Sequence, residues 1–283
     1  MMCPYCTANV PDGKVHCPAC KNPIFGKTDF TGGDAETTLL GRKGPKRTKE
    51  PRFNVGIFND VFGGSITPGL AVMSVNIVGG PPGAGKTTMF LMVSDMVLDQ
   101  DPGEALYIAT EQSDDEIEET GERLKLKNLG RIRVYNAMGG LRRDLGSILR
   151  EFKPALTILD SVTRLVGDDM AQAVRVVEWF KEATIFLKKP TLIVDQVTKD
   201  GTHAGSNQVL HGGDGVFSLI HDDTTGERLL YSSKNRKGPA PKYLHLRMLP
   251  EDAERPGLLV LDPAKYNPDG SLRQGLDEDG NED

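Results

Sequence analysis

The sequence predicts an α/β protein with a mostly parallel sheet, a nucleotide-binding loop and a small zinc-binding module ahead of the core. Apolar strands alternate with helices between Val72 and Val197. A Gly-rich loop directly follows the first of these strands. Four cysteines stand in two pairs at the N-terminus. Alternation of strands and helices favours parallel pairing, because parallel neighbours need a crossover connection.

Composition sets the limits for this prediction. A chain of 283 residues can hold one core of about 200 residues and a small module. It is 38% hydrophobic and 26% charged, it has no long apolar run, and its N-terminus does not resemble a signal peptide. We therefore expect a cytoplasmic protein with no membrane contact. The net charge of −6 means that any contact with nucleic acid must be local.

The phosphate-binding loop is the strongest motif. The segment GPPGAGKT fits G-x-x-x-x-G-K-[ST], and it joins the apolar strand Val72–Val78 to the helix Lys86–Leu98. Backbone N–H groups of such a loop surround phosphates at a helix N-terminus. We expect Lys86 to reach the β- and γ-phosphates of ATP and Thr87 to bind Mg²⁺. The residues expected to bind the cofactor are Gly80, Pro81, Pro82, Gly83, Ala84, Gly85, Lys86, Thr87 and Thr88.

Polar residues follow three further strands at their carboxyl ends, where parallel sheets bind nucleotides. Glu111 follows the strand 104–110 and is the candidate for the base that deprotonates the attacking water. Asp160 ends the apolar run that starts at Ala155 and is expected to bind Mg²⁺. Gln196 follows the strand 190–194 and is the candidate sensor of the γ-phosphate.

The four cysteines have the spacing C-x2-C-x10-C-x2-C, at Cys3, Cys6, Cys17 and Cys20. Two such pairs suit one tetrahedral Zn²⁺ held by four thiolates, and a closed shell of this kind is structural. Two disulfides are the alternative, which a reducing compartment disfavours.

The whole sequence divides into four parts. We expect a zinc ribbon at 1–27, a basic linker at 28–52, the ATPase core at 53–263 and an acidic tail at 264–283. The run 42–52 carries six basic residues against one acidic residue, so it is either a solvated tether or a contact for a phosphate backbone.

The C-terminal part of the core predicts an antiparallel extension of the sheet. Strands at 215–221 and 228–233 form a hairpin that leads to Lys234, Asn235 and Arg236. Two more strands are expected at 243–249 and 258–261, and the Gly-rich stretch 199–215 is expected to be a loop. Further helices are expected at 114–124, 141–152 and 170–187.

Together these motifs resemble the bacterial RadA/Sms family of RecA-like ATPases, over nearly everything from Cys3 to about Gly238. The cysteine spacing matches the zinc ribbon of that family. Four other segments are similar to family motifs: Phe58–Gly69 to E-F-D-R-V-L-G-G-G-L-V-P-G, Ala105–Ser113 to A-L-Y-V-S-G-E-E-S, Val197–Gly205 to H-V-T-K-E-G…A-G, and Lys234–Gly238 to K-N-R-F-G.

The resemblance implies a hexameric ring that binds single-stranded or branched DNA and uses ATP to drive branch migration. It implies that Lys234 and Arg236 reach the γ-phosphate of a neighbouring subunit and that the loop 199–215 lines the pore. A recombinase or replication protein is a further implied partner. Lys237 replaces the phenylalanine of the family motif, and Gln196 replaces a histidine. The family's Lon-protease-like C-terminal domain has no counterpart here, so any ring is expected to assemble without it.

Two other functions fit the same core. One is a replicative-type helicase, which the polarity of movement and fork unwinding would distinguish. The other is a nucleotide-controlled switch of the KaiC type, which regulates partners without moving along DNA. The zinc ribbon favours a DNA-translocating ATPase over the switch.

Overall fold

The computed structural model describes residues 8–9, 17–19, 50–63, 67–138, 145–167, 169–196, 207–222, 224–249 and 256–260. Nearly all of the described residues belong to the core. Among them, no helix is both long enough and apolar enough to cross a bilayer.

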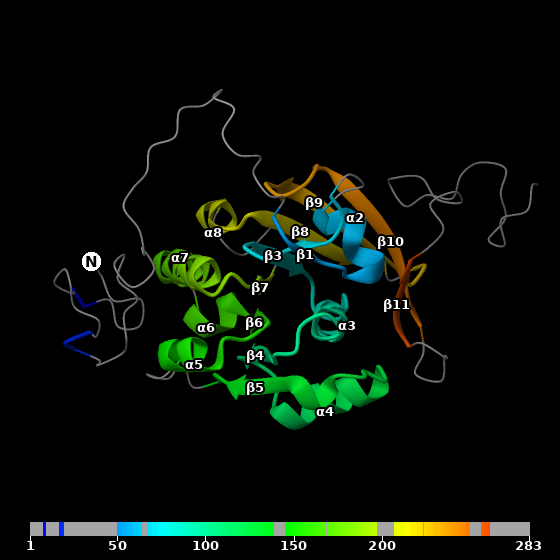
Figure 1. The fold of residues 1–283 in the computed structure, drawn as a ribbon. Coiled ribbons are helices and arrows are strands. Elements are labelled where there is room, and N and C mark those ends of the chain that lie inside the picture. Colours follow the sequence, from blue (N-terminus) through cyan, green and yellow to red (C-terminus); the bar gives the residue numbers. More distant parts are fainter. Residues whose placement is uncertain are drawn as a thin grey trace, which may run out of the picture.

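A twisted sheet forms the centre of the core (Figure 1). Within the described residues it has nine strands in the order β11-β10-β9-β8-β3-β7-β6-β4-β5. The strands are β3 (Val75–Gly80), β4 (Ala105–Ala109), β5 (Ile132–Asn136), β6 (Leu156–Asp160), β7 (Thr191–Gln196), β8 (Gly215–His221), β9 (Glu227–Asn235), β10 (Lys242–Leu249) and β11 (Gly257–Val260). Strands β8, β3, β7, β6, β4 and β5 run parallel, and β9, β10 and β11 extend the sheet with antiparallel pairs.

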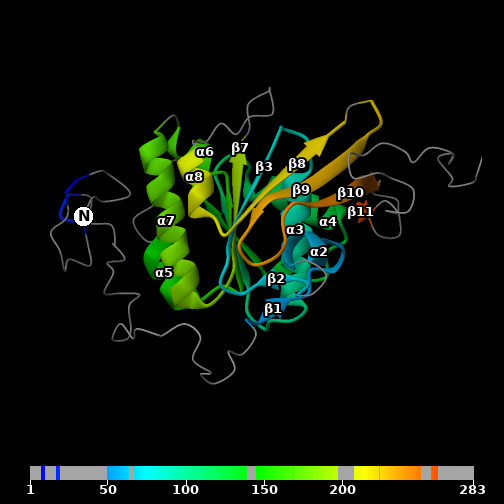
Figure 2. The ribbon, with the colours of Figure 1, turned by 90° about the horizontal axis from the view of Figure 1, so that it is seen from above.

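Helices cover both faces of this sheet, so the core has three layers (Figure 2). One face carries α2 (Asn59–Gly63), α3 (Lys86–Leu98) and α4 (Asp114–Arg123). The other carries α5 (Leu145–Phe152), α6 (Val162–Val166), α7 (Met170–Leu187) and α8 (Asn207–Gly212).

The buried side chains form one apolar cluster on each face. Successive residues of a strand point to opposite faces. In β3, for example, Val78 belongs to the cluster under α3, whereas Ile77 belongs to the cluster under α7. This explains why the central strands are apolar at nearly every position.

The prediction of an α/β core with a parallel sheet and an antiparallel extension is confirmed. The bounds differ by a few residues: β3 starts at Val75 rather than Val72, and β9 continues to Asn235. The expectation of a loop throughout 199–215 is wrong in its second part, because residues 207–212 form α8. That short helix contains Gly212 and lies against α7, and a side chain at Gly212 would collide with Val177.

A two-stranded sheet and a 3-10 turn precede the phosphate-binding strand. β1 (Arg52–Phe53) pairs with β2 (Leu70–Ala71), and the turn η1 (Gly56–Phe58) leads into α2. The Arg52 guanidinium donates to the carbonyl oxygen of Gly69 at 2.9 Å. Among the described residues, β1 thus starts one residue before Phe53, and the start of the core stays a prediction.

Candidate functional site

The carboxyl ends of the parallel strands bring the predicted residues to one edge of the sheet. β3 ends at Gly80, β6 ends at Asp160, and β7 ends at Gln196. Glu111 follows β4 by two residues. Gly80 and Gln196 are paired in register across β3 and β7. The Gln196 side chain lies outside what the structure describes, so its role as a phosphate sensor stays a prediction.

The phosphate-binding loop needs glycine at two positions. Gly83 has φ +79° and Gly85 has φ +100°, a region that other residues rarely adopt. Gly85 is also the residue that precedes α3, so the loop turns directly into the helix N-terminus. In this geometry the N-terminal N–H groups of α3 point toward the place where an anion would bind in the loop.

Lys86 closes over this loop. Its ammonium donates hydrogen bonds to the carbonyl oxygens of Gly80, at 2.7 Å, and Pro81, at 2.8 Å. Burial lowers the pKa of the ammonium, while the charges of Asp160 and Glu111 act in the opposite direction. The cation therefore sits where phosphate oxygens of a nucleotide could replace the two carbonyls.

Asp160 and Thr87 form the expected magnesium pair. The Thr87 hydroxyl donates to Oδ2 of Asp160 at 3.2 Å. Tyr107, from the neighbouring strand β4, donates to the same oxygen at 2.5 Å. Burial raises the pKa of Asp160, and the hydrogen bonds from Tyr107 and Thr87 oppose this effect. A hydroxyl beside a carboxylate is the type of oxygen-ligand pair that Mg²⁺ prefers.

Glu111 lies at the same edge of the sheet and contacts Ser161, the residue that follows Asp160. The Ser161 hydroxyl donates to Oε1 of Glu111 at 3.2 Å, and the Arg164 guanidinium on α6 lies 3.6 Å from the same oxygen. These contacts hold the carboxylate beside the nucleotide cleft, where a general base would act.

A cleft of about 520 Å³ joins these residues. Its lining includes the phosphate-binding loop with Lys86, Thr87 and Thr88, and also Glu111 and Asp160. Its volume falls in the range of small-molecule and cofactor sites. The cleft therefore has the groups that a nucleotide with its magnesium ion needs: the phosphate-binding loop, the Lys86 ammonium and the carboxylates of Glu111 and Asp160.

The cleft also contains residues that the sequence motifs did not identify. Thr120 and Arg123 come from α4, Arg228 from the start of β9, and Met248 from the end of β10. The Arg228 guanidinium donates to the carbonyl oxygen of Ala84 in the phosphate-binding loop at 3.0 Å. The position of Arg228 at a strand end was the only signal in the sequence, because its approach to the loop depends on the antiparallel pairing of β8 with β9.

Lys234 and Arg236 lie at the opposite end of the sheet, beside the amino ends of the parallel strands. β9 runs antiparallel to β8, so its carboxyl end pairs with Gly215 and Val216 at the start of β8. The two cations are therefore remote from the phosphate-binding loop of their own chain. The sequence motifs alone could not place them, because this placement follows from strand direction.

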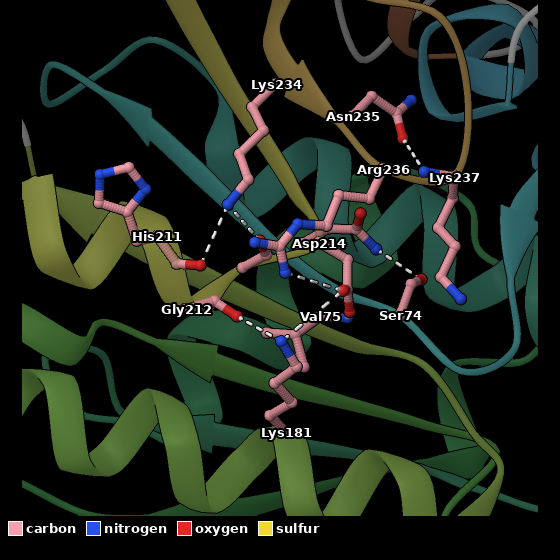
Figure 3. A network of polar contacts seen from close by, with 12 residues as sticks. Ser74, Val75, Lys181, His211, Gly212, Asp214, Lys234, Asn235, Arg236 and Lys237 are labelled. Carbon is pink, nitrogen blue, oxygen red and sulfur yellow. Dashed lines mark hydrogen bonds and ion pairs between the residues drawn. The ribbon is translucent and has the colours of Figure 1, made fainter. Parts of the chain in front are cut away.

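A polar network holds this segment (Figure 3). The half-buried Lys234 ammonium donates to the backbone carbonyls of Leu210, His211 and Gly213, at 3.1, 3.1 and 2.7 Å. The exposed Arg236 guanidinium lies 3.9 Å from Asp214, and its backbone N–H donates to the Asp214 carbonyl at 2.8 Å.

Lys237, which replaces the family phenylalanine, pairs with Glu50 at 2.8 Å. An ion pair with the segment before β1 thus stands where the family motif has an aromatic side chain. The backbone carbonyl of Lys237 accepts a further hydrogen bond from Arg52 at 2.5 Å.

The predicted zinc ligands lie mostly outside the described residues. Cys17 is described and is buried, whereas Cys3, Cys6 and Cys20 are not described. The zinc site stays a prediction.

Comparison with known proteins gives several relatives, although no protein-family model matches the chain. The chain is 32% identical over 189 residues to the DNA repair protein RadA of Streptococcus pyogenes serotype M6, which covers 64% of this chain and 40% of that protein. It is 30% identical over 200 residues to the DNA repair protein RadA of Bacillus subtilis, which covers 68% and 42%. For the protein of the same name from Listeria monocytogenes the identity is 28% over 219 residues, which covers 74% and 46%.

The matched part spans less than half of the length of each of these relatives. Within that part, the parallel sheet and the phosphate-binding loop agree with a RecA-like core. The resemblance noted in the motifs is thereby confirmed, and this chain is a homologue of the RadA/Sms family.

Proposed function

We propose that this chain is a DNA-dependent ATPase of recombination and repair, which moves along single-stranded DNA and drives branch migration. One observation carries the ATPase part: Lys86, Thr87, Asp160 and Glu111 line a single cleft at the carboxyl edge of the sheet. The DNA part rests on the similarity to proteins named DNA repair protein RadA.

The chain's own residues have separate roles in this reaction. Lys86 binds the β- and γ-phosphates in place of the carbonyls of Gly80 and Pro81. Thr87 and Asp160 hold Mg²⁺, which neutralises charge on the phosphate oxygens when it is bound. Glu111 orients the attacking water and accepts its proton.

The site is completed between subunits in this proposal. Arg236 and Lys234 lie at the edge of the sheet opposite to their own phosphate-binding loop, so in a ring of identical subunits, in our proposal a hexamer, they face the cleft of a neighbour. There a cation stabilises the γ-phosphate charge, as an arginine finger does. Gln196 reports the γ-phosphate to the stretch 199–215, which binds the DNA backbone.

The experiment is the rate of ATP hydrolysis with and without single-stranded DNA. We expect DNA to stimulate the wild-type protein. We expect Glu111→Gln to bind ATP while its rate falls by about 10²–10⁴-fold, since only the base is lost. Lys86→Ala should lose binding or hydrolysis. The matched control is Glu119→Gln, which removes the same charge from an exposed position on α4.

Two results would contradict the proposal. Near-normal turnover of Glu111→Gln would remove that residue from the reaction. Hydrolysis that DNA leaves unchanged would argue against a translocating ATPase and favour a nucleotide-controlled switch.

A further inference from the structure

We propose that Tyr107 is a positioning residue for the proposed magnesium site: its buried hydroxyl holds the Asp160 carboxylate in the orientation that binds the metal. This inference rests on the proposed ATPase function and adds to it a buried residue that does not line the nucleotide cleft.

The pairing of β4 with β6 places Tyr107 close to Asp160, on the side away from the carboxyl ends of the strands. It lies on β4, next to β6, and the register pairs Tyr107 with Ile158 and Ala109 with Asp160. The Tyr107 ring therefore starts two residues further from the carboxyl edge than Asp160. A tyrosine side chain that leans along the strand covers this distance, and its hydroxyl donates to Oδ2 of Asp160 at 2.5 Å.

The ring of Tyr107 is completely buried in the apolar cluster under α3. Phenylalanine would fill the same space without a polar atom, and a buried hydroxyl is unfavourable unless it finds a partner. Here the partner is the carboxylate, and a hydrogen bond to a charged group is stronger than one between neutral groups. The one polar atom of this side chain thus contacts the Asp160 carboxylate and the neighbouring Thr87 side chain.

Two donors share Oδ2 of Asp160, and the Tyr107 hydroxyl also interacts with the Thr87 side chain. Tyr107 donates from the core, and Thr87 donates at 3.2 Å from the start of α3. Thr87 is itself an expected magnesium ligand. Tyr107 is not, so its role in this proposal is to orient the Asp160 carboxylate without coordinating the metal. Groups that orient a ligand in this way commonly contribute about 10–100-fold to metal affinity.

The test is Tyr107→Phe, which removes only the hydroxyl. We measure the Mg²⁺ concentration that gives half-maximal Mg²⁺-dependent binding of a fluorescent, non-hydrolysable ATP analogue. We expect this concentration to rise about 10–100-fold, as for loss of other groups that orient a metal ligand, while binding of the analogue in EDTA stays as in the wild type. The matched control is Tyr231→Phe on β9, whose ring stacks on Tyr243 with centroids 6.1 Å apart. It should leave the Mg²⁺ midpoint unchanged.

A double-mutant cycle with Asp160→Asn separates positioning from a general loss of structure. If Tyr107 acts through Asp160, Tyr107→Phe changes the Mg²⁺ midpoint much less in the Asp160→Asn background than in the wild type. An equal change in both backgrounds overturns the inference, as does an unchanged midpoint for Tyr107→Phe. Failure of the wild-type protein to bind the analogue would instead overturn the proposed ATPase function, and this inference with it.

Discussion

The Lys234 ammonium donates a hydrogen bond to the backbone carbonyl of Gly213 at 2.7 Å, which ties β9 to the segment that follows α8. Two further carbonyls, of Leu210 and His211, accept from the same ammonium at 3.1 Å. Carbonyl groups at the end of a helix lack partners within the helix, and a cation there satisfies them. Lys234 therefore stabilises its own chain, whatever it does toward a neighbour.

We expect Lys234→Met to lower the free energy of unfolding by about 1–3 kcal/mol, the usual range for hydrogen bonds to a charged group. The measurement is urea unfolding followed by circular dichroism. Lys242→Met on β10 is the matched control, because it removes a half-buried lysine from the neighbouring strand. Equal free energies of unfolding for the Lys234 and Lys242 variants would show that the hydrogen bonds from the Lys234 ammonium to the three carbonyls do not stabilise the fold.

A second prediction concerns the ion pair between Asp101 and Lys189, whose side chains are 14% and 28% exposed. Burial acts to raise the pKa of Asp101. The hydrogen bonds from Lys189 and from the Gly103 N–H, together with the charges of Lys189 and Arg131, lower the pKa by a larger amount, so the net shift is downward. A carboxylate with a lowered pKa stabilises the folded state above its unfolded pKa, near 3.8. This contribution is lost as the pH falls through the lowered value.

We therefore expect Asp101→Asn to destabilise the core at pH 7 by about 1–3 kcal/mol. The difference from the wild type should shrink as unfolding is measured at lower pH, because the wild-type carboxylate becomes protonated. Asp99→Asn is the control, since Asp99 is exposed and its bond from Asn128, at 3.0 Å, can be kept by an amide oxygen. A difference that does not change with pH would mean that the charge of Asp101 is not the stabilising feature.

The sequence was enough to predict the residues that follow strand ends. Glu111 and Asp160 each stand after a short apolar run, and such runs have a recognisable length and period. The phosphate-binding loop is a local motif, so its geometry depends on neighbours in the chain. Once the strands are parallel, their carboxyl ends must meet at one edge of the sheet.

The rest of the site depends on contacts between distant parts of the chain. Arg228 and Met248 reach the nucleotide cleft only because β8 pairs with β3, and β9 and β10 are added beside it. Tyr107 has the pattern of any buried strand residue, and only the register of β4 against β6 brings its hydroxyl to Asp160. Helix α8 was missed because its six residues include a glycine at the end and are too short to show a helical period.

A third prediction is that the segment 1–27 holds one zinc ion per chain, through Cys3, Cys6, Cys17 and Cys20. Elemental analysis of the purified protein measures the ratio. Cys17→Ser should lose the metal and unfold this segment, because a zinc site of four thiolates supplies most of the folding energy of so small a unit. The ATPase core should keep its melting temperature. Metal-free protein with four thiols that react in the native state would rule the site out.

The last prediction is that hydrolysis uses residues of two subunits. Arg236 is exposed and lies at the sheet edge opposite to the phosphate-binding loop of its own chain, so it cannot serve that loop. Arg236→Ala should therefore bind ATP almost normally and hydrolyse it slowly, about 10³-fold or more below the wild type if the residue acts as an arginine finger.

Mixing variants tests this arrangement directly. Glu111→Gln subunits retain Arg236, and Arg236→Ala subunits retain Glu111, so a mixed assembly contains interfaces with both groups intact. We expect the mixture to hydrolyse ATP faster than either variant alone, at equal total protein and with single-stranded DNA present. The control mixes Arg236→Ala with the double variant Glu111→Gln/Arg236→Ala, in which no interface regains Arg236. If subunits exchange, as a tagged subunit would report, and the first mixture still shows no gain over this control, then Arg236 acts within its own chain through its contact with Asp214.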